Sequence, residues 1–137
     1  MLFKTVLVPV SEDLRERSEE ALKALRELQP EKTVLLHVLP PVPLAIAGKD
    51  RESIGKEEEA EAAKAVFAGF EEVPHKRMIR HGEPATVITK TAEEIGADLI
   101  LMVSTGQDNL GEMLAGSTAE RVLRNTRIML LVIKKTA

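Results

Sequence analysis

Short apolar runs alternate with stretches of helical periodicity along the whole chain. Four of these runs are rich in Val, Ile and Leu, which predicts β-strands, and the first of them does not alternate with polar residues, which is typical of a strand buried on both faces of a parallel sheet. They are Thr5 to Val10, Thr33 to Leu39, Leu99 to Val103 and Ile128 to Ile133. A fifth and weaker run, His75 to Arg80, has only Met78 and Ile79 as consecutive apolar residues and is expected at a sheet edge.

Between these runs, apolar residues recur at intervals of three and four, which predicts amphipathic helices. Gly82-Glu-Pro84 is a helix start and Gly96 a helix end, since proline suits the first helical position and glycine the position after the last turn. The segment from Pro40 to about Ser53 has no periodicity and is expected to be a loop. The predicted helices are Leu14 to Leu28, Glu57 to Phe70, Pro84 to Ile95 and Ser117 to about Asn125. The inward-facing candidates are Ala60, Ala63, Ala65, Val66, Phe67 and Phe70 in the second helix, and Val87, Ile88, Thr91, Ala92 and Ile95 in the third.

This alternation of strands and helices predicts an α/β fold, a parallel sheet with helices on both faces, in a single domain over residues 1–137. In open sheets of this type, ligands bind beyond the carboxyl ends of the strands, where the winding reverses. The strand ends Pro9-Val-Ser11, His37-Val38 and Val103-Ser-Thr-Gly106 are therefore expected to converge on one crevice.

Composition narrows the classes of function. The chain has no cysteine, a net charge of −3 and three phenylalanines as its only aromatic residues. Thiol chemistry is excluded, and the concentrated positive charge and stacking surface typical of nucleic-acid binding are missing. No apolar run approaches the ~18 residues of a membrane span, so we expect a cytoplasmic protein without a membrane partner. The three histidines have no metal-site spacing, and no metal site is predicted.

The stretch after the fourth strand is the best candidate for chemistry. Gly106 and Gly116 are separated by nine residues, and Ser117 follows directly. Strand, glycine loop and helix start together point unpaired N–H groups at an anion, which favours a phosphate site. A structural interpretation is also available, because Ser117-Thr-Ala-Glu120 fits a helix capping box. The lysine of a P-loop is absent, so the residues alone leave both interpretations open.

The chain as a whole resembles the universal stress protein family. The resemblance rests on Lys4-Thr-Val-Leu-Val-Pro-Val, Leu36-His-Val, Gly82-Glu-Pro-Ala, Ala97-Asp-Leu-Ile-Leu-Met and Gly106 through Gly116-Ser117-Thr-Ala-Glu-Arg-Val-Leu. It implies a three-layer sandwich of the adenine nucleotide alpha-hydrolase-like type, with a five-stranded parallel sheet in the order 3-2-1-4-5. It also implies a homodimer formed through the terminal strand, Ile128 to Ile133. An apolar strand at a sheet edge needs such a cover, although a helix could supply it instead.

Many members of this family bind ATP through Gly-x2-Gly-x9-Gly-Ser/Thr, whereas a second branch lacks this motif and binds no nucleotide. The resemblance places the phosphates on Gly106, Gly116, Ser117 and Thr118, and the nucleoside on Pro9, Val10, Ser11, Val38, Met102 and Val103. Two positions depart from the motif: Val103 stands where the first glycine is expected, and Ser11 where ATP-binding relatives usually have aspartate. Val103 adds bulk, and Ser11 replaces a charge-assisted hydrogen bond of about 1.5–3 kcal/mol by a neutral one.

The sequence thus predicts a cytoplasmic homodimer that binds ATP or a related adenine nucleotide, with Mg²⁺ accompanying it, as a regulatory signal rather than as an enzyme. The alternative is a universal stress protein that binds no nucleotide and acts as a dimeric interaction module. Slow ATP hydrolysis is a third interpretation, for which Asp13, Asp108 and Glu112 are the nearest acids.

Overall fold

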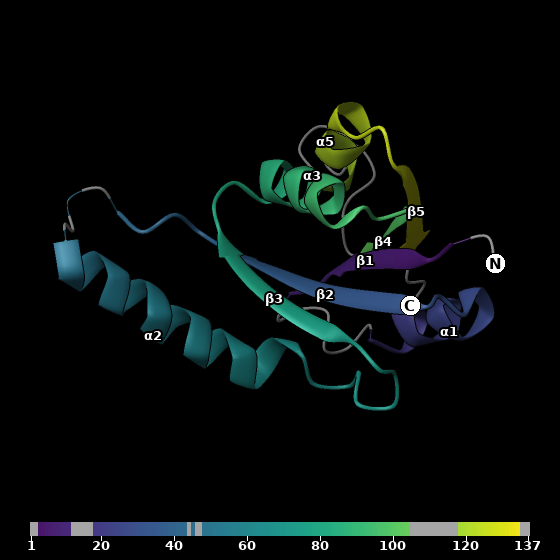
Figure 1. Ribbon diagram of the computed structural model, residues 1–137, viewed down its shortest axis with the longest axis horizontal. Helices are drawn as coiled ribbons and strands as arrows, with labels where there is room; N and C mark the ends of the chain where they lie inside the picture. Colours follow the sequence, from purple (N-terminus) through teal and green to yellow (C-terminus); the bar gives the residue numbers. More distant parts are fainter. Residues whose placement is uncertain (1–2, 12–17, 44, 46–47, 105–117, 135–137) are drawn as a thin grey trace.

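The computed structural model describes residues 3–11, 18–43, 45, 48–104 and 118–134. They form a five-stranded parallel sheet in the order β3-β2-β1-β4-β5, as the family resemblance implies. Figure 1 shows α3 and α5 over one face of the sheet and α1 and α2 over the other. The elements are β1 (Thr5–Pro9), α1 (Ser18–Leu28), β2 (Lys32–Leu39), α2 (Gly48–Val66), β3 (Lys76–His81), α3 (Pro84–Ile95), β4 (Leu99–Ser104), α5 (Thr118–Asn125) and β5 (Met129–Lys134).

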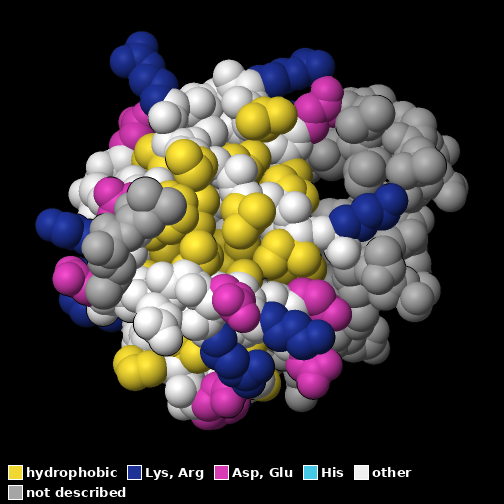
Figure 2. Space-filling model, turned by 90° about the vertical axis from the view of Figure 1, so that its right-hand side faces the viewer, with side chains coloured by type: hydrophobic (Ala, Val, Ile, Leu, Met, Phe, Trp, Pro, Cys, Tyr) yellow, Lys and Arg dark blue, Asp and Glu magenta, His cyan; other side chains and the backbone are white. Residues whose placement is uncertain are grey.

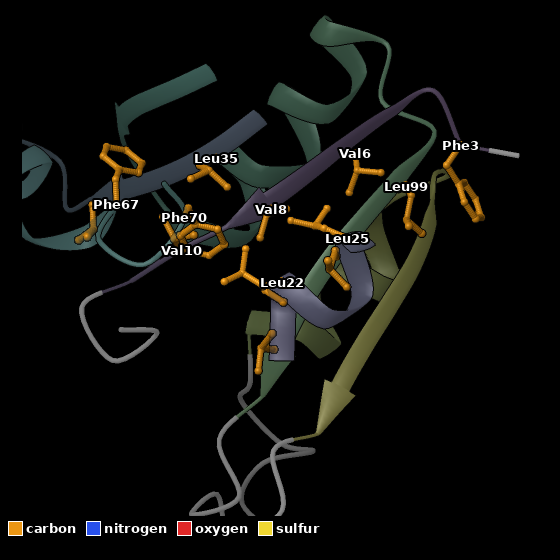
Figure 3. Close-up of a cluster of buried hydrophobic side chains, with 14 residues drawn as sticks. Phe3, Val6, Val8, Val10, Leu22, Leu25, Leu35, Phe67, Phe70 and Leu99 are labelled. Atoms are coloured by element: carbon orange, nitrogen blue, oxygen red, sulfur yellow. The ribbon is translucent and has the colours of Figure 1, made fainter. Parts of the chain in front are cut away.

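Two apolar cores flank the sheet, because neighbouring side chains of a strand point to opposite faces. Under α1 and α2, Val6 and Val8 of β1 and the following Val10 pack with Leu22 and Leu25 of α1, as Figure 3 shows. Phe67 and Phe70, which follow α2, close the other side of this first core. The second core lies under α3 and α5 and contains Leu7, Val34, Leu36, Ala85, Ile88, Ala92, Ala97, Ile100 and Val122.

The prediction for α2 was wrong at both ends. The helix begins at Gly48, inside the segment expected to be a loop, and ends at Val66 rather than Phe70. Its first half carries charged residues around its circumference, so it shows no apolar period. Local pairs such as Lys56 with Glu52, at 3.6 Å and four residues apart, support it instead. Ala60 is exposed, and Ala62 is buried in its place.

The start and end of α3 follow the prediction. Glu83 caps the first turn, Pro84 takes the first helical position, and Gly96 ends the helix in the left-handed region with φ 68°. Ala85, Ile88, Thr91 and Ala92 are the buried residues of this helix. Val87 and Ile95, predicted on the same face, are partly buried against the second core.

The two edge strands differ in character. β3 presents the exposed Lys76 and Arg77, as its weak apolar pattern predicted. β5 presents Met129, Leu131 and Val132, which are 61%, 38% and 42% exposed. Within the residues placed by the structure, no helix has the length and apolar character needed to cross a membrane.

Candidate functional site

A cavity of about 270 Å³ opens at the carboxyl ends of β1, β2 and β4, where the winding of the sheet reverses. β1 is the switch strand: the chain winds from it to β2 and β3 on one side, and β4 and β5 lie on the other. The lining residues are Pro9, Val10, Ser11, Leu36, His37, Val38, Pro84, Ile88, Met102, Val103 and Thr118.

The helices α3 and α5 supply the second wall of this cavity. Both begin at the edge of the sheet where the parallel strands end, because each follows a strand in the chain. Pro84 is the first residue of α3 and Ile88 lies one turn further along, while Thr118 is the first residue of α5. The cavity therefore has apolar side walls and a helix start at its rim, a combination that suits a flat apolar group joined to an anion.

All six residues predicted to contact a nucleoside line this single cavity: Pro9, Val10, Ser11, Val38, Met102 and Val103. Thr118, predicted on the phosphate side, lines it as well. Gly106, Gly116 and Ser117 lie outside the described residues, and so do Asp13, Asp108 and Glu112. The structure thus brings distant parts of the chain together, and their role in binding stays a prediction.

The two departures from the family motif differ in their surroundings. Val103 is 9% exposed, packs in the first core and also lines the cavity. It pairs with Ile133 of β5 as ordinary strand backbone. Ser11 is exposed at the cavity, where it offers a hydroxyl and no charge.

Sequence reasoning missed three lining residues, Leu36, Pro84 and Ile88, whereas His37 belongs to a strand end that was expected in the crevice. Pro84 and Ile88 were assigned only to the start and the inner face of a helix. Their place at the site follows from topology, since a helix that comes directly after a parallel strand begins at the same sheet edge where ligands bind. The helix start at Gly82-Glu-Pro84 could therefore have placed Pro84 and Ile88 at the predicted crevice.

The start of α3 is fixed by the carboxylate of Glu83. One oxygen accepts hydrogen bonds from the Thr86 amide and hydroxyl, both at 2.8 Å, and the other accepts from the Ala85 amide at 3.2 Å. Arg121 of α5 adds a guanidinium N–H at 2.7 Å. The hydrogen bonds from Thr86, followed by the smaller effects of Ala85 and Arg121, lower the pKa of Glu83.

The three histidines make structural hydrogen bonds. Nδ1 of His37, His75 and His81 lies 2.8, 2.7 and 3.0 Å from the carbonyl oxygens of Val10, Val73 and Pro40. Among the residues that the structure describes, no cluster of three His, Cys, Asp or Glu side chains is arranged to hold a metal ion.

A larger hollow of about 550 Å³ lies between the first half of α2 and the end of β3, and His81 lines it. Its charged side chains have local partners: Arg51 donates to the Pro43 carbonyl at 2.8 Å, and Lys56 pairs with Glu52. These contacts leave no concentrated charge of one sign, and the convergence of three strand ends favours the first cavity as the candidate site.

Comparison with known proteins identifies the family. The chain matches the Universal stress protein family over residues 2–134. It belongs to the universal stress protein family. Universal stress protein MJ0531 of Methanocaldococcus jannaschii is 35% identical, over 98% of this chain and 84% of that protein. Universal stress protein MJ0577 of the same organism is 32% identical, over 98% of this chain and 97% of that protein.

Solved universal stress proteins share the architecture. The structure of MJ0577 superposes with a TM-score of 0.75 at 30% identity, covering 100% of this chain and 99% of that one. Two more distant structures contain adenine nucleotides. One universal stress protein was solved with cAMP (TM-score 0.63, 19% identity, 99% of this chain and 100% of that one). Another, from Archaeoglobus fulgidus, was solved with dAMP (TM-score 0.56, 21% identity, 98% of this chain and 100% of that one).

Proposed function

We propose that this universal stress protein is a small cytoplasmic homodimer that binds ATP or a related adenine nucleotide as a regulatory ligand, without acting as an enzyme. The observation that carries the proposal is the cavity at the ends of β1, β2 and β4. Its side walls include Val38, Met102 and Ile88, an apolar environment for a purine ring. Ser11 and Thr118 add hydroxyl groups.

The phosphates would lie toward the start of α5. Thr118 opens this helix at the cavity, and a helix start attracts anions through its unpaired N–H groups and the helix dipole. Gly106, Gly116 and Ser117 precede it in the chain and belong to this end of the proposed site. Mg²⁺ would accompany the nucleotide, because it is commonly held by phosphate oxygens and water. The universal stress proteins solved with cAMP and dAMP support an adenine nucleotide as the ligand of this fold.

The exposed edge of β5 supports a homodimer. Figure 2 shows a hydrophobic area on the side of the molecule that carries this edge, and β5 contributes the exposed Met129, Leu131 and Val132. An unpaired apolar edge promotes association with another chain, whereas the charged edge of β3 opposes it. We therefore propose that a second copy covers β5, through the strand predicted as Ile128 to Ile133.

A universal stress protein that binds no nucleotide is the second candidate, and two observations favour it. Ser11 lacks the carboxylate that ATP-binding relatives usually have, and the cavity of about 270 Å³ is smaller than most ligand pockets, which span roughly 300–1,000 Å³. In that case the dimer itself would be the functional unit, as an interaction module.

Thermal unfolding with and without Mg-ATP separates the two candidates. A ligand at about 100 times its dissociation constant stabilises the folded state by about 2.7 kcal/mol, which corresponds to several degrees. Ser117→Ala should reduce this shift if the phosphates lie at the α5 start. Ser11→Trp should abolish it by filling the cavity mouth from an exposed position, and it should leave the unfolding temperature of the free protein nearly unchanged.

The outcomes are distinct. A shift for the unsubstituted protein that Ser11→Trp abolishes supports nucleotide binding in this cavity. No shift with a dimeric protein supports the interaction module. The mass in solution tests the dimer: Leu131→Lys should yield monomers, while Lys76→Glu on the opposite edge should leave the mass unchanged.

A further inference from the structure

One carboxylate joins the two helices that form the second wall of the cavity. Glu83 caps α3 through the amides of Ala85 and Thr86, and its Oε1 also accepts a hydrogen bond from Arg121 at 2.7 Å. The two residues are 38 positions apart in the chain, so this contact is a link between helices and not a local pair. In Figure 1, α3 and α5 lie next to each other on the same face of the sheet.

Both ends of this link adjoin residues of the cavity. Pro84 follows Glu83 directly, and Thr118 lies one turn before Arg121 on α5. Pro84 and Thr118 line the cavity, whereas Glu83 and Arg121 do not. The neighbour of Arg121, Val122, is fully buried in the second core. The helix α5 is thus held to the sheet by Val122 and to the start of α3 by Arg121.

We propose that Glu83 and Arg121 are positioning residues of the nucleotide site: their ion pair sets the separation of the α3 and α5 starts, and nucleotide affinity depends on it. This inference rests on the proposed function. Arg121 acts through Thr118 and the first turn of α5, because its guanidinium is engaged by Glu83. A displaced helix start would aim its N–H groups away from the phosphates, since hydrogen bonds weaken steeply as distance and angle depart from their preferred values.

The same geometry predicts that the ion pair matters more for affinity than for folding. The side chains of Glu83 and Arg121 are 45% and 46% exposed, and ion pairs this open to water contribute little to stability. Arg121→Gln also leaves the cap of α3 in place, because Ala85 and Thr86 still donate to Glu83. The variant should therefore fold.

Arg124→Gln is the matched control. Arg124 lies on the same helix, one turn further along, and pairs with Glu120 at 2.8 Å. Its side chain is 74% exposed, and it does not line the cavity. The control removes the same charge from the same helix without touching the link to α3, so it separates a general charge effect from a positioning effect.

The experiment measures the dissociation constant of Mg-ATP by calorimetry and the unfolding temperature of each variant. We expect Arg121→Gln to weaken binding by about 3- to 10-fold while Arg124→Gln stays within about 1.5-fold of the unsubstituted protein. Both variants should unfold within about 2 °C of it. Unchanged affinity in Arg121→Gln overturns this proposal alone. Failure of the unsubstituted protein to bind Mg-ATP overturns the proposed function together with it.

A double-substitution cycle and a measurement without ligand complete the test. Because the proposed effect comes from the ion pair as a unit, the double variant Glu83→Gln with Arg121→Gln should weaken nucleotide binding no more than the more damaging of the two single substitutions. Additive losses of affinity would contradict a shared role. Hydrogen exchange should quicken at the first turn of α5 in Arg121→Gln and not in Arg124→Gln. Equal exchange in both variants overturns the positioning role, whatever the ligand is.

Discussion

Gly82, between β3 and α3, satisfies two constraints that alanine would violate. The first is its φ of +148°, a backbone conformation that residues with a Cβ atom rarely adopt, held by the hydrogen bond that its N–H donates to the Leu39 carbonyl at 2.8 Å. A Cβ built on Gly82 would lie 2.6 Å from Cγ2 of Val87, closer than non-bonded carbon atoms approach. The residue therefore controls how α3, and with it Pro84, meets the end of the sheet.

The cost of Gly82→Ala follows from these two constraints. A non-glycine residue in such a backbone region costs about 1–3 kcal/mol, and an extra methyl group in a filled space about 1–3 kcal/mol more. We expect the free energy of unfolding to fall by about 2–6 kcal/mol in total. For a chain of this size, roughly 3–5 °C of unfolding temperature correspond to each kcal/mol.

Urea unfolding measures this loss of stability. Two further variants separate the contribution of the clash with Val87 from that of the backbone strain. Val87→Ala combined with Gly82→Ala removes the clash but keeps the backbone strain, so the double variant should recover about 1–2 kcal/mol relative to the sum of the singles. Gly96 has φ +68°, and a Cβ at this position would have nothing within 4 Å. Gly96→Ala should therefore lower the free energy of unfolding only by the backbone strain, roughly 1–2 kcal/mol. A Gly82→Ala variant within about 0.5 kcal/mol of the unsubstituted protein, or strict additivity with Val87→Ala, would refute the reasoning.

Three further substitutions have expected outcomes. Gly55→Ala should stabilise the protein by about 0.5–1 kcal/mol in urea unfolding, because it removes a glycine from the α2 interior and its Cβ would meet its neighbours at an ordinary 3.7 Å. Asp98→Ala should destabilise it by about 1–2 kcal/mol in the same assay, because one carboxylate oxygen accepts from the amides of Lys4 and Thr5, both at 2.9 Å. Since the folded state lowers the pKa of Glu83 below 4.5, its stabilisation is present above pH 4.5 and is lost as the pH falls through the lowered value. In urea unfolding across this pH range, the unsubstituted protein should be more stable than Glu83→Gln near neutral pH, and this difference should disappear in acid. A difference in stability that persists in acid would contradict this prediction.

The sheet was predictable because its strands obey simple rules. Apolar runs mark β1, β2, β4 and β5, although β5 is an exposed edge strand, and the charged, weakly apolar β3 is the other edge. The first half of α2 was not predictable in the same way, because its residues bury little and its support is local. Gly55 also stands within it, and glycine lowers helix propensity, so neither periodicity nor propensity indicated a helix there.

The candidate site followed from the sequence as far as strand ends determine it, because the ends of β1, β2 and β4, Val103 among them, line one cavity. The motif, which has glycine at the Val103 position, does not show on which face of the sheet this side chain packs. Side chains alternate along a strand, however, and Met102 packs with the second core while Val103 packs with the first. The face assignment depends on register with β1 and β5, which a motif alignment does not supply. Val103 is buried and still lines the cavity, whereas Ser11 is exposed there and offers a hydroxyl in place of a carboxylate. The two departures from the motif therefore differ in kind, since Val103 adds side-chain volume and Ser11 removes a charge.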